Sequence, residues 1–184
     1  MPSTTPLLLT IEDYRATPEG SRCQLIEGEM QMAPAPNRFH QEIIWNLSQL
    51  FGRYLENHPV GRIYLAPFDV VLSENDVVQP DLLLVLNEHA ARLAEDGLHG
   101  APDLVVEVVS PATALLDKKT KRNLYARSGV KEMWLIDPLL LQVQVYDFRR
   151  STAKPVAILE ENETLSSPLL PNCELAVANI LKRG

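Results

Sequence analysis

Three ionisable residues in the middle of the chain have the types and spacing of a metal site that cleaves phosphodiester bonds. Asp81 begins an apolar run, Glu107 lies inside a run of valines, and Lys121 follows in a basic segment. An ionised carboxylate in so apolar a strand costs several kcal/mol unless a cation, a hydrogen-bond network or protonation compensates it. Two carboxylates on neighbouring strands can hold a hard divalent cation together with phosphate oxygens. A nearby lysine can orient the attacking water or stabilise the charge that develops on phosphorus. The set predicts a phosphodiester hydrolase if the three residues meet in space.

The segment after the Glu107 strand is expected to bring Lys121 back to Glu107. Residues 110–113 leave the strand, and a helix is predicted to run to about Arg127, with glycine at 129 ending it. Asp117, Lys121 and Tyr125 recur every four residues, so they fall on one stripe of that helix. A helix that folds back along the strand directs this stripe toward Glu107.

Structural interpretations of the same residues remain open. Asp81 follows a proline and could cap a strand, and Lys121 could pair with Asp117 across one helical turn. Tyr125 could belong to the core or support the site from behind. His40, near the start of a long helix, could be structural or could contact a phosphate or a water.

The apolar periodicity predicts alternating helices and strands, which indicates a mixed α/β fold with a sheet covered by helices. A single domain is expected over residues 10–184, after a flexible tail at residues 1–9. Trp45 and Trp134 are expected in the core. Predicted helices cover residues 11–17, 38–57, 88–95, a segment ending near 127, and 177–181. Predicted strands cover residues 24–26, 29–32, 63–72 with a break at proline 67, 82–86, 103–109, 133–136, 141–146, 156–159 and a short piece after 171; residues 97–102 are expected to form a loop.

Composition is that of a globular domain, with 46% apolar and 22% charged residues in a chain of 184. The net charge of −7 argues against a nonspecific nucleic-acid coat protein. It leaves room for a local basic patch, because six basic residues fall between Lys118 and Lys131. That cluster is either a solvated helix face or a surface for nucleic acid. Cys23 and Cys173 are too few for a disulfide framework, and the run at residues 7–9 is too short for a membrane span. A cytoplasmic protein with no membrane partner is therefore expected.

An ordered set of motifs, spread over residues 10–180, resembles the Uma-two family. The motifs are Leu-Ile-Glu-Gly-Glu-Met, Pro-x-Pro, His40-Gln, Gln-Pro-Asp81, Gly-Ala-Pro-Asp-Leu-Val-Val-Glu107-Val-Val-Ser-Pro-Ala-Thr, Asp117-xxx-Lys121-xxx-Tyr125 and Ser-Gly-Val-Lys-Glu-Met-Trp-Leu-Ile-Asp-Pro. This is a bacterial family of the PD-(D/E)XK, restriction-endonuclease-like superfamily. The resemblance implies a restriction-endonuclease-like α/β core and cleavage of DNA with Mg²⁺ or Mn²⁺. It implies Asp81 and Glu107 as metal ligands and Lys121 as the catalytic lysine, with Glu27, His40, Asp117 and Tyr125 as candidate supporting or substrate contacts.

The chain departs from the family pattern at two positions. The superfamily name describes a lysine two residues after the second acid, where this chain has Val109, so the resemblance implies that Lys121 on the helix takes its place. The family often has glutamate where this chain has Gln24, and Glu27 or Glu29 are the available substitutes.

These departures keep rival functions open. One is an inactive nuclease fold that binds nucleic acid or protein. Another is a hydrolase of small phosphate esters, which the absence of a glycine-rich phosphate loop weakens. A homodimer is expected for the nuclease, since cutting both strands of a duplex is easier with two sites.

Overall fold

A six-stranded mixed sheet, sheet B, forms the centre of the computed structural model. The structure describes residues 8–18, 20–110 and 116–184, and the side chains of residues 116–118 are not described. The order of sheet B is β12-β11-β10-β9-β6-β3. The strands are β3 (Gly61–Leu65), β6 (Leu82–Leu86), β9 (Leu104–Val108), β10 (Glu132–Asp137), β11 (Gln142–Asp147) and β12 (Ala157–Glu160).

A second sheet, sheet A, has the order β2-β1-β5-β4-β8-β7, and a separate hairpin pairs β13 with β14. Its strands are β1 (Cys23–Ile26), β2 (Glu29–Met32), β4 (Val70–Ser73), β5 (Asp76–Val78), β7 (Leu93–Ala94) and β8 (Gly97–His99); the hairpin is β13 (Thr164–Ser167) and β14 (Leu170–Ala176). The helices are α1 (Ile11–Arg15), α2 (Arg38–Asn57), the 3₁₀ helix η1 (Asn87–Arg92), the π-helix η2 (Leu116–Lys121), α3 (Arg122–Ser128) and α4 (Val177–Ile180). The predicted mixed α/β class is confirmed.

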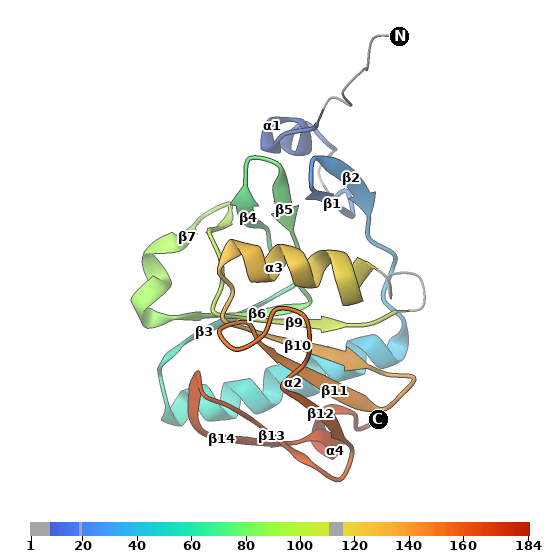
Figure 1. The fold of residues 1–184 in the computed structure, drawn as a ribbon, viewed down its shortest axis with the longest axis vertical. Coiled ribbons are helices and arrows are strands. Elements are labelled where there is room, and N and C mark those ends of the chain that lie inside the picture. Colours follow the sequence, from blue (N-terminus) through green and yellow to red (C-terminus); the bar gives the residue numbers. More distant parts are fainter. Residues whose placement is uncertain (1–7, 19, 111–115) are drawn as a thin grey trace.

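Helices cover both faces of sheet B (Figure 1), and the buried side chains beneath them form two main cores. α2 packs on one face of sheet B, where Ile43, Leu47 and Phe51 meet Trp134 and residues of the C-terminal hairpin. α3 lies between the other face of sheet B and sheet A, with Leu124 and Tyr125 in the core that joins the two sheets. Within the described residues, no helix is long and apolar enough to cross a membrane.

Strand β9 presents its side chains alternately to these two cores. Val106 belongs to the α2 core, whereas Val105 and Val109 belong to the α3 core. Glu107 therefore faces α3, as the alternation predicts. β9 runs antiparallel to β6, with Leu82 opposite Val106, so the next position along the ladder brings Asp81 opposite Glu107.

Local sequence signals account for the elements that surround the site. Asn37 caps α2, since its Oδ1 accepts a hydrogen bond from the backbone N–H of His40 at 2.9 Å. Gly129 ends α3 in the left-handed region, with φ of 92°. Glu27 and Gly28 both have positive φ, as the two central residues of a type I′ hairpin turn require.

Several expectations about individual elements differ from the structure. The break predicted at proline 67 is found, but the two halves, β3 and β4, belong to different sheets and do not continue one strand. The loop expected at residues 97–102 contains β8, which pairs in parallel with β4. Trp45 is 64% exposed rather than buried, because α2 covers sheet B with a different face.

The expected tail at residues 1–9 falls mostly on residues 1–7, which lie outside the described residues. Leu9 is described, and its N–H donates to the Gly28 carbonyl oxygen at 2.9 Å.

A buried acid, Glu132, lies in the α2 core away from Asp81 and Glu107. It is fully buried, and its carboxylate accepts hydrogen bonds from Trp134 Nε1 at 2.6 Å and Ser167 Oγ at 2.9 Å. Burial raises the pKa of Glu132 above its ordinary value, although the two hydrogen bonds act in the opposite direction. Folding therefore favours the protonated acid, and this contribution to stability is lost as the pH rises through the folded-state pKa.

Replacing Glu132 with glutamine is expected to stabilise the protein at pH 8. Glutamine can accept from Trp134 and donate to Ser167 without burying a charge. The expected rise in Tm is about 2–4 °C, the shift that about 1 kcal/mol produces in a domain of this size. Thermal unfolding near pH 4, where the glutamate of the folded protein is protonated, should show little difference between the two proteins. A variant that is less stable at both pH values contradicts this account.

Candidate active site

A cavity of about 820 Å³ opens at the end of β6 and β9 where Asp81 and Glu107 lie. α1, the β1–β2 hairpin, the proline-rich connector at residues 33–36 and the first turns of α2 form its walls. Asp81, Glu107, Lys121 and His40 all line it. The structure thus brings the acid–acid–lysine set to one place, although the three residues come from separate elements.

Glu107 is held by two residues of the following helical segment. Lys121 Nζ lies 3.0 Å from each carboxylate oxygen, and Tyr125 Oη donates a hydrogen bond to Oε1 at 2.6 Å. Glu107 is 3% exposed and Lys121 is 4% exposed, so this ion pair is shielded from bulk solvent. The pair compensates the carboxylate charge that the valine strand would otherwise disfavour.

The route by which Lys121 reaches Glu107 differs from the predicted single α-helix. Lys121 is the last residue of the π-helix η2, and α3 begins at the next residue. Lys121 and Tyr125 still lie one turn apart and both reach Glu107, as the stripe predicted. The side chain of Asp117 lies outside the described residues.

Asp81 is fixed by one of its two carboxylate oxygens. Oδ2 accepts a hydrogen bond from the Val108 N–H at 2.7 Å and lies 3.1 Å from His40 Nε2. No described residue donates to Oδ1, and Asp81 lines the cavity. His40 therefore lies close enough to support Asp81, and one carboxylate oxygen remains available to a ligand.

Glu27 is not brought to the cavity. The tight turn directs its carboxylate to Arg127, which also contacts Asp76. Glu29 is exposed and does not line the cavity either. Gln24 does line it, so the position where the family often has glutamate is part of the site, whereas Val109 is buried in the α3 core.

A hydrogen-bonded group at the cavity wall was not predicted. Tyr14 Oη donates to Asp69 Oδ1 at 2.9 Å, and Gln79 Nε2 donates to the same oxygen at 2.7 Å. Gln79 also donates its backbone N–H to Gln24 Oε1 at 3.0 Å. These residues come from four separate segments, and no spacing pattern in the sequence connects them.

Most described side chains of the basic cluster contact other residues of the protein, although Lys119 and Arg127 remain partly open to solvent. Of its six side chains, that of Lys118 is not described and Lys119 is exposed. The other four make intramolecular contacts: Lys121 with Glu107, Arg122 with the ring of Tyr146, Arg127 with Glu27 and Asp76, and Lys131 with Glu88 and Asp103. The cluster mainly neutralises the protein's own acids.

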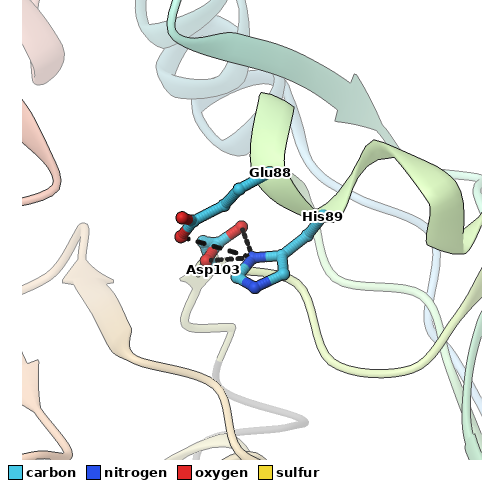
Figure 2. A group of neighbouring side chains, drawn as sticks. All are labelled: Glu88, His89 and Asp103. Atoms are coloured by element: carbon cyan, nitrogen blue, oxygen red, sulfur yellow. Dashed lines mark hydrogen bonds and ion pairs between the residues drawn. The ribbon is translucent and has the colours of Figure 1, made fainter.

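A second group of possible metal ligands lies at the opposite end of β6 and β9. Figure 2 shows Glu88, His89 and Asp103 pointing toward one another. Lys131 Nζ lies 3.0 Å from Glu88 and 2.9 Å from Asp103, where it supplies the positive charge. Burial opposes ionisation of Asp103, but hydrogen bonds from the Leu86 N–H, Lys131 and His89 outweigh it, so the pKa of Asp103 lies below its ordinary value. This group is a structural ion-pair network around one buried carboxylate.

The model of the Uma2 family, described as "Putative restriction endonuclease", matches residues 11–178. No curated protein matches the chain. Five chains of solved structures match, among them the "putative nuclease belonging to DUF820 from Anabaena variabilis ATCC 29413". That structure is 18% identical, covers 94% of this chain and 97% of its own, and superposes with a TM-score of 0.77, which establishes a shared fold.

Proposed function

Because the chain belongs to the Uma2 family, we propose that it is a divalent-metal-dependent endonuclease that hydrolyses phosphodiester bonds in DNA. The observation that carries the proposal is the meeting of Asp81, Glu107 and Lys121 in one cavity. Two carboxylates and one lysine at the end of two inner strands of the central sheet are the groups that such a reaction needs.

The residues of the cavity fit a hard cation. Oxygen donors suit Mg²⁺ or Mn²⁺, which bind through one or two carboxylates and fill their remaining positions with water and phosphate oxygens. Asp81 Oδ1 and Glu107 would supply the carboxylate ligands. An ion bound there would polarise the phosphodiester and lower the pKa of a bound water.

The other residues would position these groups and stabilise charge. Tyr125 orients the Glu107 carboxylate from behind, and His40 together with the Val108 N–H orients Asp81. Lys121 Nζ would turn from Glu107 toward the scissile phosphate, where an ammonium stabilises the negative charge of the transition state. In this proposal Tyr125 and His40 would act through the metal ligands that they contact.

A second candidate is an inactive nuclease fold that binds nucleic acid or protein. It is favoured by the ion pair itself, because Lys121 neutralises Glu107 without a metal ion. Metal binding separates the two candidates, since only the nuclease needs the carboxylates to hold an ion.

The test is a calorimetric titration of Mn²⁺ into the wild-type protein and into the Asp81→Asn variant, combined with nicking of supercoiled plasmid. Asparagine keeps the acceptor for the Val108 N–H, but it removes the charge and places an amide nitrogen where the proposed ligand oxygen Oδ1 was. We expect one ion to bind to the wild type and metal affinity to fall at least about tenfold in the variant, with nicking lost in parallel.

The matched control is Glu88→Gln, which removes one carboxylate from the second acidic group. Its metal binding should equal that of the wild type. If metal binding is lost in Glu88→Gln and kept in Asp81→Asn, the ion binds at the group of Glu88, His89 and Asp103, and the proposal is refuted.

A further inference from the structure

The cavity has a second wall that phosphodiester hydrolysis does not use. Tyr14, Gln24, Asp69 and Gln79 form it, and we call these four residues the polar wall. The whole cavity holds about 820 Å³. A divalent ion with six waters occupies on the order of 200 Å³, taking roughly 30 Å³ for each water. The rest of the volume is in the range of pockets that enclose an entire small organic group.

Gln24 places an unused hydrogen-bond donor in this wall. It is 5% exposed, and its Oε1 accepts from the Gln79 N–H at 3.0 Å. This contact fixes the orientation of the amide, because an amide nitrogen cannot accept a hydrogen bond. Nε2 is left for the cavity and donates to no described residue. The Nε2 atom is accessible from the cavity, where it offers a hydrogen-bond donor to a ligand that supplies an acceptor.

Asp69 places an acceptor in the same wall. Its Oδ1 is taken by Tyr14 and Gln79, and its Oδ2 accepts from no described residue. Burial, and then the hydrogen bond to Asp69, raise the pKa of Tyr14 well above its ordinary value, so the phenol keeps its proton and holds Asp69 in place. A carboxylate repels a phosphate group and suits an N–H donor instead.

We propose that the polar wall binds the Watson–Crick edge of an unpaired nucleobase whose neighbouring phosphate lies at Asp81 and Glu107. This inference rests on the proposed nuclease function. Every base presents donors and acceptors side by side on that edge, and a duplex hides them in pairing. The apolar side chains of Met32, Ile44 and Leu65 also line the cavity and suit the faces of a base. The substrate is therefore single-stranded, or a duplex with a nucleotide extruded from its stack.

The test measures binding without cleavage. The wild-type protein is titrated into an oligonucleotide containing 2-aminopurine, once as a single strand and once fully paired, and the fluorescence of that base is followed. Ca²⁺ replaces Mg²⁺, since it has the same charge and oxygen preference but longer bonds. We expect at least about tenfold tighter binding of the single strand. Equal affinity for the two forms overturns the inference.

Two isosteric variants test the polar wall itself. Gln24→Glu keeps the acceptor for the Gln79 N–H but replaces the cavity-facing donor with an acceptor. Asp69→Asn keeps the acceptor for Tyr14 and Gln79 but replaces the cavity-facing acceptor with a donor. Each should weaken single-strand binding about tenfold, on the scale of one good base contact. Asp69→Asn is the sharper variant, because loss of a negative charge alone would tighten binding to a polyanion, whereas Gln24→Glu also adds an acid to the cavity of the proposed cation.

The control Glu29→Gln removes one exposed negative charge outside the cavity. If Asp69→Asn binds the single strand as tightly as Glu29→Gln does, the polar wall does not contact the base. Plasmid nicking with Mg²⁺, measured in parallel on the wild type, decides the proposed function separately. A protein that nicks but shows no preference for unpaired bases refutes only the base-binding inference.

Discussion

Replacing Glu107 with glutamine is expected to reduce Mg²⁺-dependent DNA cleavage at least about 10³-fold, a change of about 4 kcal/mol in transition-state stabilisation. Glutamine has the shape of glutamate and can still accept the hydrogen bond from Tyr125 Oη. It lacks the charge that would hold the cation, and it sets an amide beside the ammonium of Lys121. The measurement is the single-turnover rate on a supercoiled plasmid at saturating Mg²⁺.

The matched control is Glu132→Gln, the same substitution at the other fully enclosed glutamate. It should leave cleavage unchanged, because Glu132 contacts Trp134 and Ser167 in the α2 core and does not line the cavity. Thermal unfolding of both variants shows whether each is folded at the assay temperature. A folded Glu107→Gln protein that cleaves within tenfold of the wild-type rate would rule out Glu107 as a ligand of the catalytic ion.

Replacing Lys121 with methionine is expected to reduce cleavage about 10²- to 10³-fold and to destabilise the metal-free protein by about 3–5 kcal/mol. The side chain is 5% exposed and lies 3.0 Å from both oxygens of Glu107, so its loss removes the cation that faces a buried carboxylate. A bound divalent ion can replace that charge. Mg²⁺ should therefore raise the Tm of the variant more than it raises the Tm of the wild type.

The double variant Glu107→Gln/Lys121→Met separates stability from catalysis. Removing both charges should recover much of the stability lost in Lys121→Met, since neither an acid nor an ammonium is left uncompensated. Its cleavage should stay as low as that of Glu107→Gln. If Lys121→Met cleaves at the wild-type rate and gains no extra stability from Mg²⁺, Lys121 is a structural counterion and the inactive nuclease fold is the better account.

The residues of the candidate site could be identified from the sequence because their local environments are unusual. A carboxylate between valines conflicts with burial, and this conflict marks Glu107 whatever the tertiary structure. Strand alternation and helical spacing then predict which face of β9 carries it and that Lys121 and Tyr125 share a stripe. The caps at Asn37 and Gly129 and the mixed α/β class follow from equally local patterns.

The tertiary structure decided the features that depend on which segments become neighbours. No pattern in the sequence connects Tyr14, Gln24, Asp69 and Gln79, because hydrogen bonds between distant segments leave no periodic signal. The sequence could not show that Glu27 lies away from the cavity, because its ion pair with Arg127 joins residues that are far apart in the chain. The exposure of Trp45 depends on which face of α2 sheet B covers, and the separation of β3 from β4 depends on which strands pair. Local patterns determined which acids and which lysine lie at one end of the cavity, whereas long-range packing determined the shape of the cavity and its polar wall.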